Sequence, residues 1–217
     1  MLDVIYEDNH IIVVYKPKGI LSQADGSNKP DMLTIIKDYI KEKYNKPGNV
    51  YLGLVHRLDI NTSGIMVFAK TSKAASRLSD SIKNHSFVKK YKATIEGFLD
   101  NNEYITLENY IIKDEKQRKA YIYNNGQFAS LEYKALKSYK IKNMVVTDID
   151  IILHTGRFHQ IRCQMANIGH PLYGDTKYGS KISLNNDDFP LVAYSLSFPH
   201  PTTKELMEFK RNWQLNI

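Results

Sequence analysis

The stretch Val55-His56-Arg57-Leu58-Asp59-Ile60-Asn61-Thr62-Ser63-Gly64 leads directly into Ile65-Met66-Val67-Phe68-Ala69. The second segment is a continuous apolar run, which predicts a buried strand, and the Asn-Thr-Ser-Gly before it is typical of a turn. A carboxylate on a turn at the edge of a rigid sheet is well placed for catalysis, which makes Asp59 a candidate catalytic residue. Local chemistry alone favours a simpler interpretation, in which the aspartate caps the turn and Arg57 lies on the surface.

The sequence on either side predicts further strands and helices. Residues 11–15 form a short apolar run that ends at the turn 16–19, and residues 145–153 alternate between apolar and polar side chains, so both are expected to be strands. Residues 31–44 and the segment after residue 69 have helical spacing. The predicted buried stripes are Leu33, Ile36, Ile40 and Tyr44 in the first helix, and Ala75, Leu78 and Ile82 in the second.

Residues 87–97 alternate as a strand does, which predicts that Tyr91 points inward on the same face as Ala93. Residues 101–143 have the pattern of short polar strands joined by tight turns, such as the one at 124–126. Because the predicted strands outnumber the helices, and the helices are scattered between them, we expect an α+β fold with a mostly antiparallel sheet.

The chain has 217 residues, of which 42% are hydrophobic and 24% are charged, the balance of a folded protein. This length suits one domain, and we expect residues 1–217 to form a single one. The net charge of +7 favours a polyanionic partner, because lysine and arginine release counterions when they bind phosphates. A solvated lysine-rich surface would give the same charge, so charge alone leaves both interpretations open.

Several classes of chemistry are excluded or disfavoured by the residues present. Cys163 is the only cysteine, which excludes internal disulfides and fits a reduced compartment. The N-terminus has no signal-peptide pattern and no apolar run could span a bilayer, so we expect a cytoplasmic protein. His159 stands four residues before Cys163 on a predicted helix, but no third ligand accompanies them, and we expect no metal. The sequence also lacks phosphate-binding glycine loops and the nucleophile elbow of serine hydrolases.

A second cluster, His154-Thr155-Gly156-Arg157-Phe158-His159-Gln160-Ile161-Arg162, lies where a predicted strand turns into a helix. The apolar stripe of this helix is Phe158, Ile161, Met165 and Ile168, and Gly169 ends it. Arg162 flanks the stripe, so it should be partly buried and needs an anion, because an unpaired buried arginine is costly. A carboxylate or a phosphate would serve, and the simpler alternative is a structural ion pair with any acidic neighbour. Arg157, at the helix start, can reach a phosphate.

Six segments, spread over nearly the whole chain, form an ordered set of motifs. They are Ile12–Gly19, His56–Gly64, Phe87–Ala93, Gly156–Arg162, Gly169–Asp175 and Ala193–Thr202. The second resembles the HRLDxxTSG signature of the RluA-type pseudouridine synthases. The others resemble that family's KPxG turn, its tyrosine segment, its GRxHQIR and GHPxxGD motifs and its C-terminal strand. Because all six occur in family order, the chain is identified as a member of this family.

The resemblance implies a pseudouridine synthase catalytic fold, which is a bent, mostly antiparallel mixed sheet flanked by helices. It implies an isomerase that converts specific uridines in structured RNA to pseudouridine, in large-subunit (23S) ribosomal RNA, transfer RNA or both. In this reaction the N-glycosidic bond breaks, the uracil turns while it is held, and its C5 is joined to the ribose C1′. The family needs no cofactor and no metal. The sequence does not give the target uridine.

The roles of the family's residues carry over one by one. Asp59 matches the catalytic aspartate, Tyr91 the tyrosine that stacks on the target base, and Arg162 the arginine paired with the catalytic carboxylate. On this basis Asp59 is the anion that Arg162 requires, and the pairing should keep Asp59 ionised. Arg57 matches the arginine that fills the space left by the flipped nucleotide, since the glycosidic bond is not accessible within the stack. The expected RNA contacts are Arg57, His56, Arg157 and Lys16.

The chain departs from the family pattern in two places. After Arg162 many relatives have an x-His pair, where this chain has Cys163-Gln164. An S4-like N-terminal domain is expected to be absent, so the catalytic domain would grip RNA by itself, as a monomer. A non-catalytic RNA-binding or ribosome-assembly factor with this fold is one alternative, and a glycoside hydrolase, which would need a second carboxylate beside Asp59, is another. The presence of Asp59, Tyr91 and Arg162 together favours an active synthase.

Overall fold

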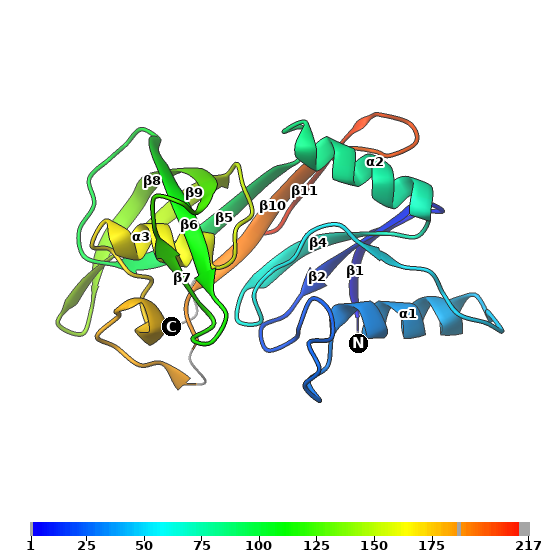
Figure 1. The fold of residues 1–217 in the computed structure, drawn as a ribbon, viewed down its shortest axis with the longest axis horizontal. Coiled ribbons are helices and arrows are strands. Elements are labelled where there is room, and N and C mark those ends of the chain that lie inside the picture. The colour runs from blue at the N-terminus through cyan, green and yellow to red at the C-terminus, as the bar shows by residue number, and fades with distance from the viewer. Residues whose placement is uncertain (1, 186–187, 213–217) are drawn as a thin grey trace. The chain divides into compact units, whose positions relative to one another are not determined.

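The computed structural model describes residues 2–185 and 188–212, and the chain divides into two compact units (Figure 1). Unit 1 comprises Met1–Val88 and Ala193–Asn212, and unit 2 comprises Lys89–Val192. Each unit has a hydrophobic cluster of its own, so a single domain over residues 1–217 stays a prediction. Within the described ranges, no helix is long and apolar enough to cross a membrane.

Unit 1 is a sheet with two helices packed on it. Its strands lie in the order β1 (Asp3–Glu7), β2 (Ile11–Lys16), β4 (Ser63–Ala69), β10 (Leu191–Pro199, which enters this unit at Ala193) and β11 (Leu206–Lys210), with the short β3 (Gly53–Leu54) also paired to β4. The pairs β1–β2, β2–β4, β3–β4 and β10–β11 are antiparallel. Helices α1 (Met32–Lys43) and α2 (Ser72–Lys83) lie on opposite sides of these strands (Figure 1). The strands predicted at 11–15 and 65–69 are confirmed.

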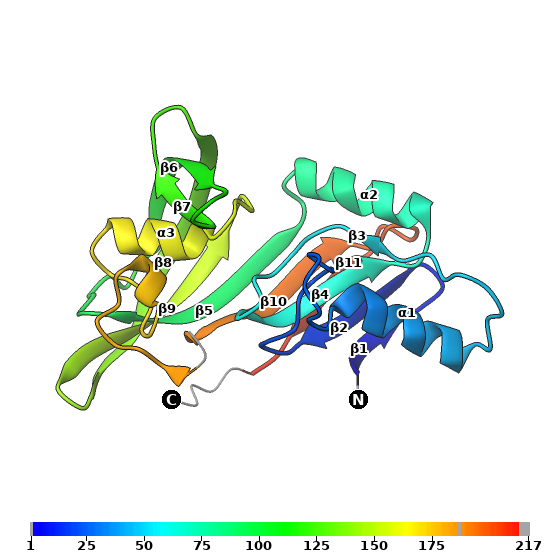
Figure 2. The same cartoon turned by 60° about the horizontal axis from the view of Figure 1, so that its bottom comes forward.

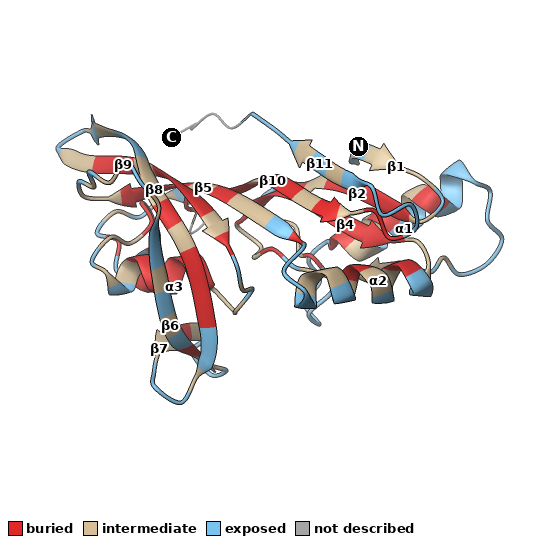
Figure 3. Ribbon diagram, turned by 90° about the horizontal axis from the view of Figure 1, so that it is seen from above, coloured by how far each residue is buried: buried red, intermediate tan, exposed pale blue. Residues whose placement is uncertain are grey.

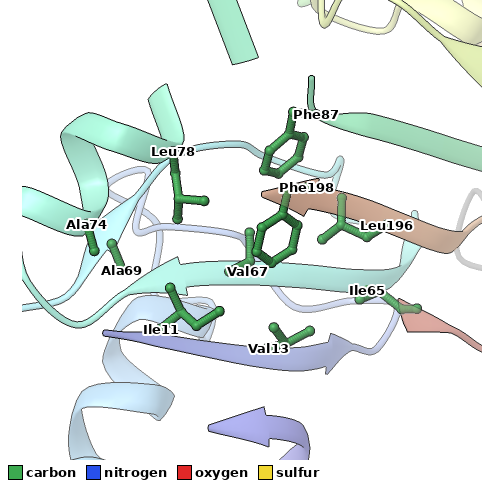
Figure 4. Packing of buried hydrophobic residues seen from close by; sticks show 10 residues of the cluster. All are labelled: Ile11, Val13, Ile65, Val67, Ala69, Ala74, Leu78, Phe87, Leu196 and Phe198. Atoms are coloured by element: carbon green, nitrogen blue, oxygen red, sulfur yellow. The ribbon is translucent and has the colours of Figure 1, made fainter. Parts of the chain in front are cut away.

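One hydrophobic cluster of unit 1 lies between α2 and the strands (Figure 4). Its buried members are Ile11, Val13, Ile65, Val67, Ala69, Ala74, Leu78, Phe87, Leu196 and Phe198. Every residue of β4 is buried, and Figure 3 shows buried residues along this strand. A strand buried on both faces reads as a continuous apolar run, which is why the sequence predicted it so clearly. β4 is therefore a rigid support for the turn that precedes it.

The first helix was predicted nearly in the right place, and the buried positions of Ile36 and Ile40 are confirmed, but the two ends of the predicted stripe, Leu33 and Tyr44, are wrong. Asp31 caps α1 by accepting a hydrogen bond from the Thr34 N–H, and the buried residues are Met32, Ile36 and Ile40. Leu33, one residue round the helix from Met32, is half-buried, and Tyr44 is 48% exposed. The stripe runs every four residues from Met32, so the prediction started one residue too late. In α2 the prediction holds, with Leu78 buried and Ala75 and Ile82 packed against the core.

Unit 2 is a second antiparallel arrangement, with strands in the order β5 (Val88–Glu96), β9 (Met144–Leu153), β8 (Gln127–Ile141), β6 (Ile105–Asp114) and β7 (Lys119–Ile122). Helix α3 (Gln160–Asn167) packs against β6 and β7 (Figure 2), and a 3-10 turn covers Thr176–Tyr178. The antiparallel pairing of these strands confirms the predicted α+β fold with a mostly antiparallel sheet.

Two predictions in unit 2 are corrected. Residues 101–143 are not short strands, because β6 has 10 residues and β8 has 15. β8 pairs with β6 on one side and β9 on the other, and a break in register between Ala135 and Lys137 disturbs the alternation that would have marked a long strand. The turn at 124–126 is present. Helix α3 has no single buried stripe, since all residues from Gln160 to Met165 are buried.

Candidate active site

The turn that carries Asp59 is fixed on both sides by hydrogen bonds within unit 1. The buried Ser22 hydroxyl accepts a bond from the Leu58 N–H at 3.0 Å and donates one to the Leu58 carbonyl at 2.8 Å. The Asp59 carbonyl accepts a bond from the Thr62 N–H at 3.0 Å. With the backbone before and after it held in this way, the Asp59 side chain projects from a pre-organised turn, which suits a catalytic group.

Lys16 links Ile60, the residue after Asp59, to the end of β2. Its side chain is completely buried, and its Nζ donates to the carbonyls of Pro17 at 2.9 Å and Ile60 at 3.1 Å. The Gly19 N–H donates to the same Ile60 carbonyl at 2.9 Å. Burial lowers the pKa of Lys16 to about 8, and the negative charge of Asp59 opposes this shift. Lys16 was predicted to contact RNA, but in this position it holds the Asp59 turn.

His56 and Arg57 precede Asp59 and differ in their surroundings. His56 is half-buried, its Nε2 accepts a hydrogen bond from the Val67 N–H at 3.1 Å, and its ring meets the Phe87 ring edge-on at 5.3 Å. An Nε2 that accepts from β4 anchors the turn to the sheet, so His56 also has a positioning role. Arg57 is exposed, and its side chain has no hydrogen bond or ion pair among the described residues, so its predicted contact with RNA stays a prediction.

Gly64 is the second residue of β4 and stands at a position that only glycine fits. Its φ is +144°, and a Cβ built there would lie 2.6 Å from the Ala193 nitrogen of β10. We expect Gly64→Ala to lower the free energy of unfolding by about 2–3 kcal/mol, from overpacking and backbone strain together. Thermal or urea unfolding measures this. Gly48→Ala is the matched control, because its Cβ would meet nothing within 4 Å, and an equal loss of stability in both variants would contradict the expectation.

Arg162 makes a two-pronged ion pair within unit 2. Its Nε donates to Asp175 Oδ2 at 2.6 Å and its Nη2 donates to Oδ1 at 2.8 Å. The Arg162 and Asp175 side chains are 9% and 1% exposed. The sequence required an anion for Arg162, and a carboxylate supplies it, but that carboxylate is Asp175, the acidic neighbour of the simpler alternative. The pairing of Arg162 with Asp59 stays a prediction.

The ring groups around the Arg162 guanidinium fix its plane. The guanidinium carbon lies 4.8 Å from the centre of the Tyr178 ring and 4.4 Å from that of Phe189. Arg162 Nη1 and His159 Nε2 are 3.1 Å apart, and His159 Nδ1 is 3.0 Å from the Tyr178 hydroxyl. Burial, and then the positive charge of Arg162, hold the pKa of His159 far below its ordinary value. Since the guanidinium can only donate, neutral His159 accepts at Nε2 and carries its proton on Nδ1.

His159 and Cys163, whose spacing could suggest a metal site, make other contacts in the structure. Both ring nitrogens of His159 have partners, and the Cys163 thiol donates to the Ala120 carbonyl at 3.5 Å. Burial raises the pKa of Cys163 to about 11, which disfavours the thiolate that a metal would need. No group of three potential metal ligands is found in the part of the chain that the structure describes.

Tyr91 and Arg157 complete the set of predicted site residues in unit 2. Tyr91 is 5% exposed on β5, where it pairs with Ile151, and so it points inward as predicted. Arg157 is half-buried, and its Nε donates to the Phe128 carbonyl at 2.8 Å. Asp59 belongs to unit 1, whereas Tyr91 and Arg162 belong to unit 2. The expected meeting of these three side chains therefore stays a prediction.

Sequence reasoning missed two residues that shape these sites. Ser22 holds both backbone groups of Leu58, and no pattern in the sequence relates residues 36 positions apart. Asp175 ends the Gly169–Asp175 segment, which was noted as a motif but given no chemical role. Its acidic side chain at the end of a turn was the available signal for a partner of Arg162.

Comparison with known proteins bears on what these sites do. The model of the family described as RNA pseudouridylate synthase matches residues 10–167. An uncharacterised RNA pseudouridine synthase of Aquifex aeolicus is 34% identical over 219 residues, which cover 96% of this chain and 68% of the relative. The ribosomal large subunit pseudouridine synthase D of Buchnera aphidicola is 33% identical over 223 residues, with coverage of 96% and 68%.

Two solved structures are similar in fold. The human RNA pseudouridylate synthase domain containing 4 protein superimposes with a TM-score of 0.77 at 20% identity, covering 98% of this chain and 88% of that one. The human domain containing 1 protein gives a TM-score of 0.74 at 21% identity, covering 98% and 83%. At such identities the likeness establishes the fold alone, and it agrees with the predicted fold class.

Proposed function

This chain belongs to the RNA pseudouridylate synthase family, and from this premise we propose that it isomerises specific uridines in structured RNA with Asp59 as the catalytic carboxylate. The observation that carries the proposal is the fixed turn around Asp59, in which Ser22 and Lys16 hold the backbone on either side. The relative named for the ribosomal large subunit favours large-subunit ribosomal RNA as the substrate, with transfer RNA as the other candidate.

The proposed reaction is an isomerisation without any co-reactant. The bond between uracil N1 and ribose C1′ breaks, a bond between C5 and C1′ forms, C5 loses a proton and N1 gains one. Because the glycosidic bond is not accessible within a stacked helix, the uridine must first be flipped out. We propose that Asp59 assists the exchange at C1′, that Tyr91 stacks on the base, and that the exposed Arg57 fills the space the nucleotide leaves.

Arg162 has the capacity to serve Asp59 as well as Asp175. A guanidinium has five N–H groups. The bonds to Asp175 use two of them and the contact with His159 uses a third. The family resemblance pairs Arg162 with the catalytic carboxylate, and we propose that Arg162, while held by Asp175, also pairs with Asp59 and keeps its carboxylate ionised during the reaction.

Pseudouridine mapping of total RNA from cells with and without the gene tests this function. We expect one or a few uridines to be modified only when the gene is present, and the purified protein to modify the same positions in an unmodified transcript. Identical maps in the two strains, together with RNA binding by the purified protein, would instead show a non-catalytic RNA-binding factor.

Sedimentation of the purified protein with and without that transcript tests the proposal that it acts as a monomer.

A further inference from the structure

Lys89 and Arg157 bring two positive charges together in unit 2 without an acidic partner. Lys89 is partly buried on β5, two residues before Tyr91, and Arg157 precedes α3. The side-chain bond of Arg157 goes to the neutral Phe128 carbonyl. Among the described residues, neither cation has a carboxylate within ion-pair distance. Two cations that share a partly buried position without an anion are an unusual arrangement, because each makes the other less favourable.

The ionisation of Lys89 reflects this arrangement. Burial, and then the charge of Arg157, lower the pKa of Lys89 to about 8. At neutral pH the ammonium is therefore held in the folded protein at a cost to stability. Residues kept at such a cost are more often found where a ligand is bound than where only the fold is served.

The ammonium is also approachable from the side of Gly156. Gly156 is exposed, and a Cβ built on it would lie 3.6 Å from Lys89 Nζ. Any larger side chain at residue 156 would begin to cover the ammonium. The glycine thus leaves an opening at the place where the two charges meet.

The position of Lys89 on its strand relates this opening to Tyr91. Residues two apart on a strand share a face and lie about 7 Å apart along it. A nucleotide whose base stacks on Tyr91 therefore brings a backbone phosphate within reach of Lys89. Lys90 points to the opposite face of the same strand.

We propose that Lys89 and Arg157 together bind one phosphate of the RNA backbone beside the target nucleotide. The inference rests on the proposed function, since it takes the substrate to be RNA. It adds Lys89, and the opening at Gly156, to Arg157, which the sequence analysis had already indicated as a phosphate contact. A phosphate supplies the anion that both cations lack, and its binding fixes the strand on one side of the flipped base.

The test compares Lys89→Gln with Lys90→Gln, which removes the same charge from the adjacent residue on the other face. RNA affinity is measured at several salt concentrations on an unmodified transcript that spans a gene-dependent pseudouridine, or on an unmodified transfer RNA transcript if mapping finds none. We expect Lys89→Gln to bind more weakly and to lower the slope of log affinity against log salt by about 0.7–0.9, the value of one phosphate contact. The ratio of wild-type affinity to Lys89→Gln affinity should then fall roughly threefold between about 50 and 200 mM salt. Lys90→Gln should keep the wild-type slope.

Further measurements separate this site from a structural role and from the proposed reaction. Lys89→Gln should unfold at the wild-type temperature or above it at pH 7, because it removes a charge that lacks a partner, and Lys89→Arg should keep the wild-type slope. An unchanged slope in Lys89→Gln, or an equal loss of slope in Lys90→Gln, would overturn the phosphate site. Such a result would leave pseudouridine formation by the wild-type protein in place, whereas an enzyme that forms none would overturn the proposed function and not the binding site.

Discussion

Asp59→Asn is expected to abolish pseudouridine formation, with a loss of roughly 10⁴-fold or more, as is usual when the central group of a catalytic set is removed. Asparagine keeps the shape of the side chain and one oxygen acceptor, but it has neither the charge nor the basicity of a carboxylate. The turn should keep its form, because Ser22 and Lys16 bind the backbone of its neighbours and not the Asp59 side chain. The measurement is single-turnover conversion of an unmodified transcript.

RNA binding by the same variant should be equal to wild type or tighter, since one negative charge is removed. Some stability should be lost, because the Asp59 charge offsets part of the effect of burial on Lys16. Thermal unfolding therefore belongs beside the activity measurement, with Asp38→Asn on the exposed side of α1 as the matched control. Conversion by Asp59→Asn within tenfold of the wild-type rate would remove Asp59 from the catalytic role, whatever the RNA affinity.

The elements that sequence predicted well are those whose pattern is local. β4 is buried on both faces and reads as an unbroken apolar run, and Tyr91 follows the two-residue alternation of β5. In α1 the same logic placed the helix and the buried Ile36 and Ile40, but it chose Leu33 over Met32 at the start of the stripe, because the two are equally apolar and only packing distinguishes them. β8 was not recognised as one strand because the shift in register near Lys137 interrupts its alternation.

The parts of the site that sequence could not predict depend on contacts between distant residues. A lysine is ordinarily expected on the surface, so nothing local indicated that Lys16 is completely buried with its ammonium on the Ile60 carbonyl, 44 residues away. The expected burial of Arg162 predicted the right kind of partner, an anion, but not which carboxylate supplies it. Asp59 and Asp175 both lie in turns, and the choice was made by resemblance to a family. In the structure, the two short hydrogen bonds from Arg162 go to Asp175.

Because Asp175 holds the buried Arg162, the second large effect expected is a loss of stability when Asp175 is replaced. In Asp175→Asn the buried Arg162 keeps its charge and loses the carboxylate that holds its Nε and Nη2. Removing one partner of a buried ion pair costs about 3–5 kcal/mol. In a chain of this length that corresponds to a fall of the melting temperature on the order of 10 °C. Glu108→Gln, on the exposed part of β6, is the control for loss of one carboxylate.

The double variant Arg162→Gln/Asp175→Asn then separates the structural role of the pair from the role proposed for Arg162 in catalysis. With both charges removed, no buried arginine is left without its Asp175 carboxylate, so part of the lost stability should return. Activity should not return, because the proposed partner of Asp59 is gone. A double variant that regains stability and converts RNA at the wild-type rate would show that Arg162 serves the fold of unit 2 alone. A double variant that is stable and inactive, beside a wild-type protein that is active, would place Arg162 in the reaction, with Asp175 as the residue that positions it.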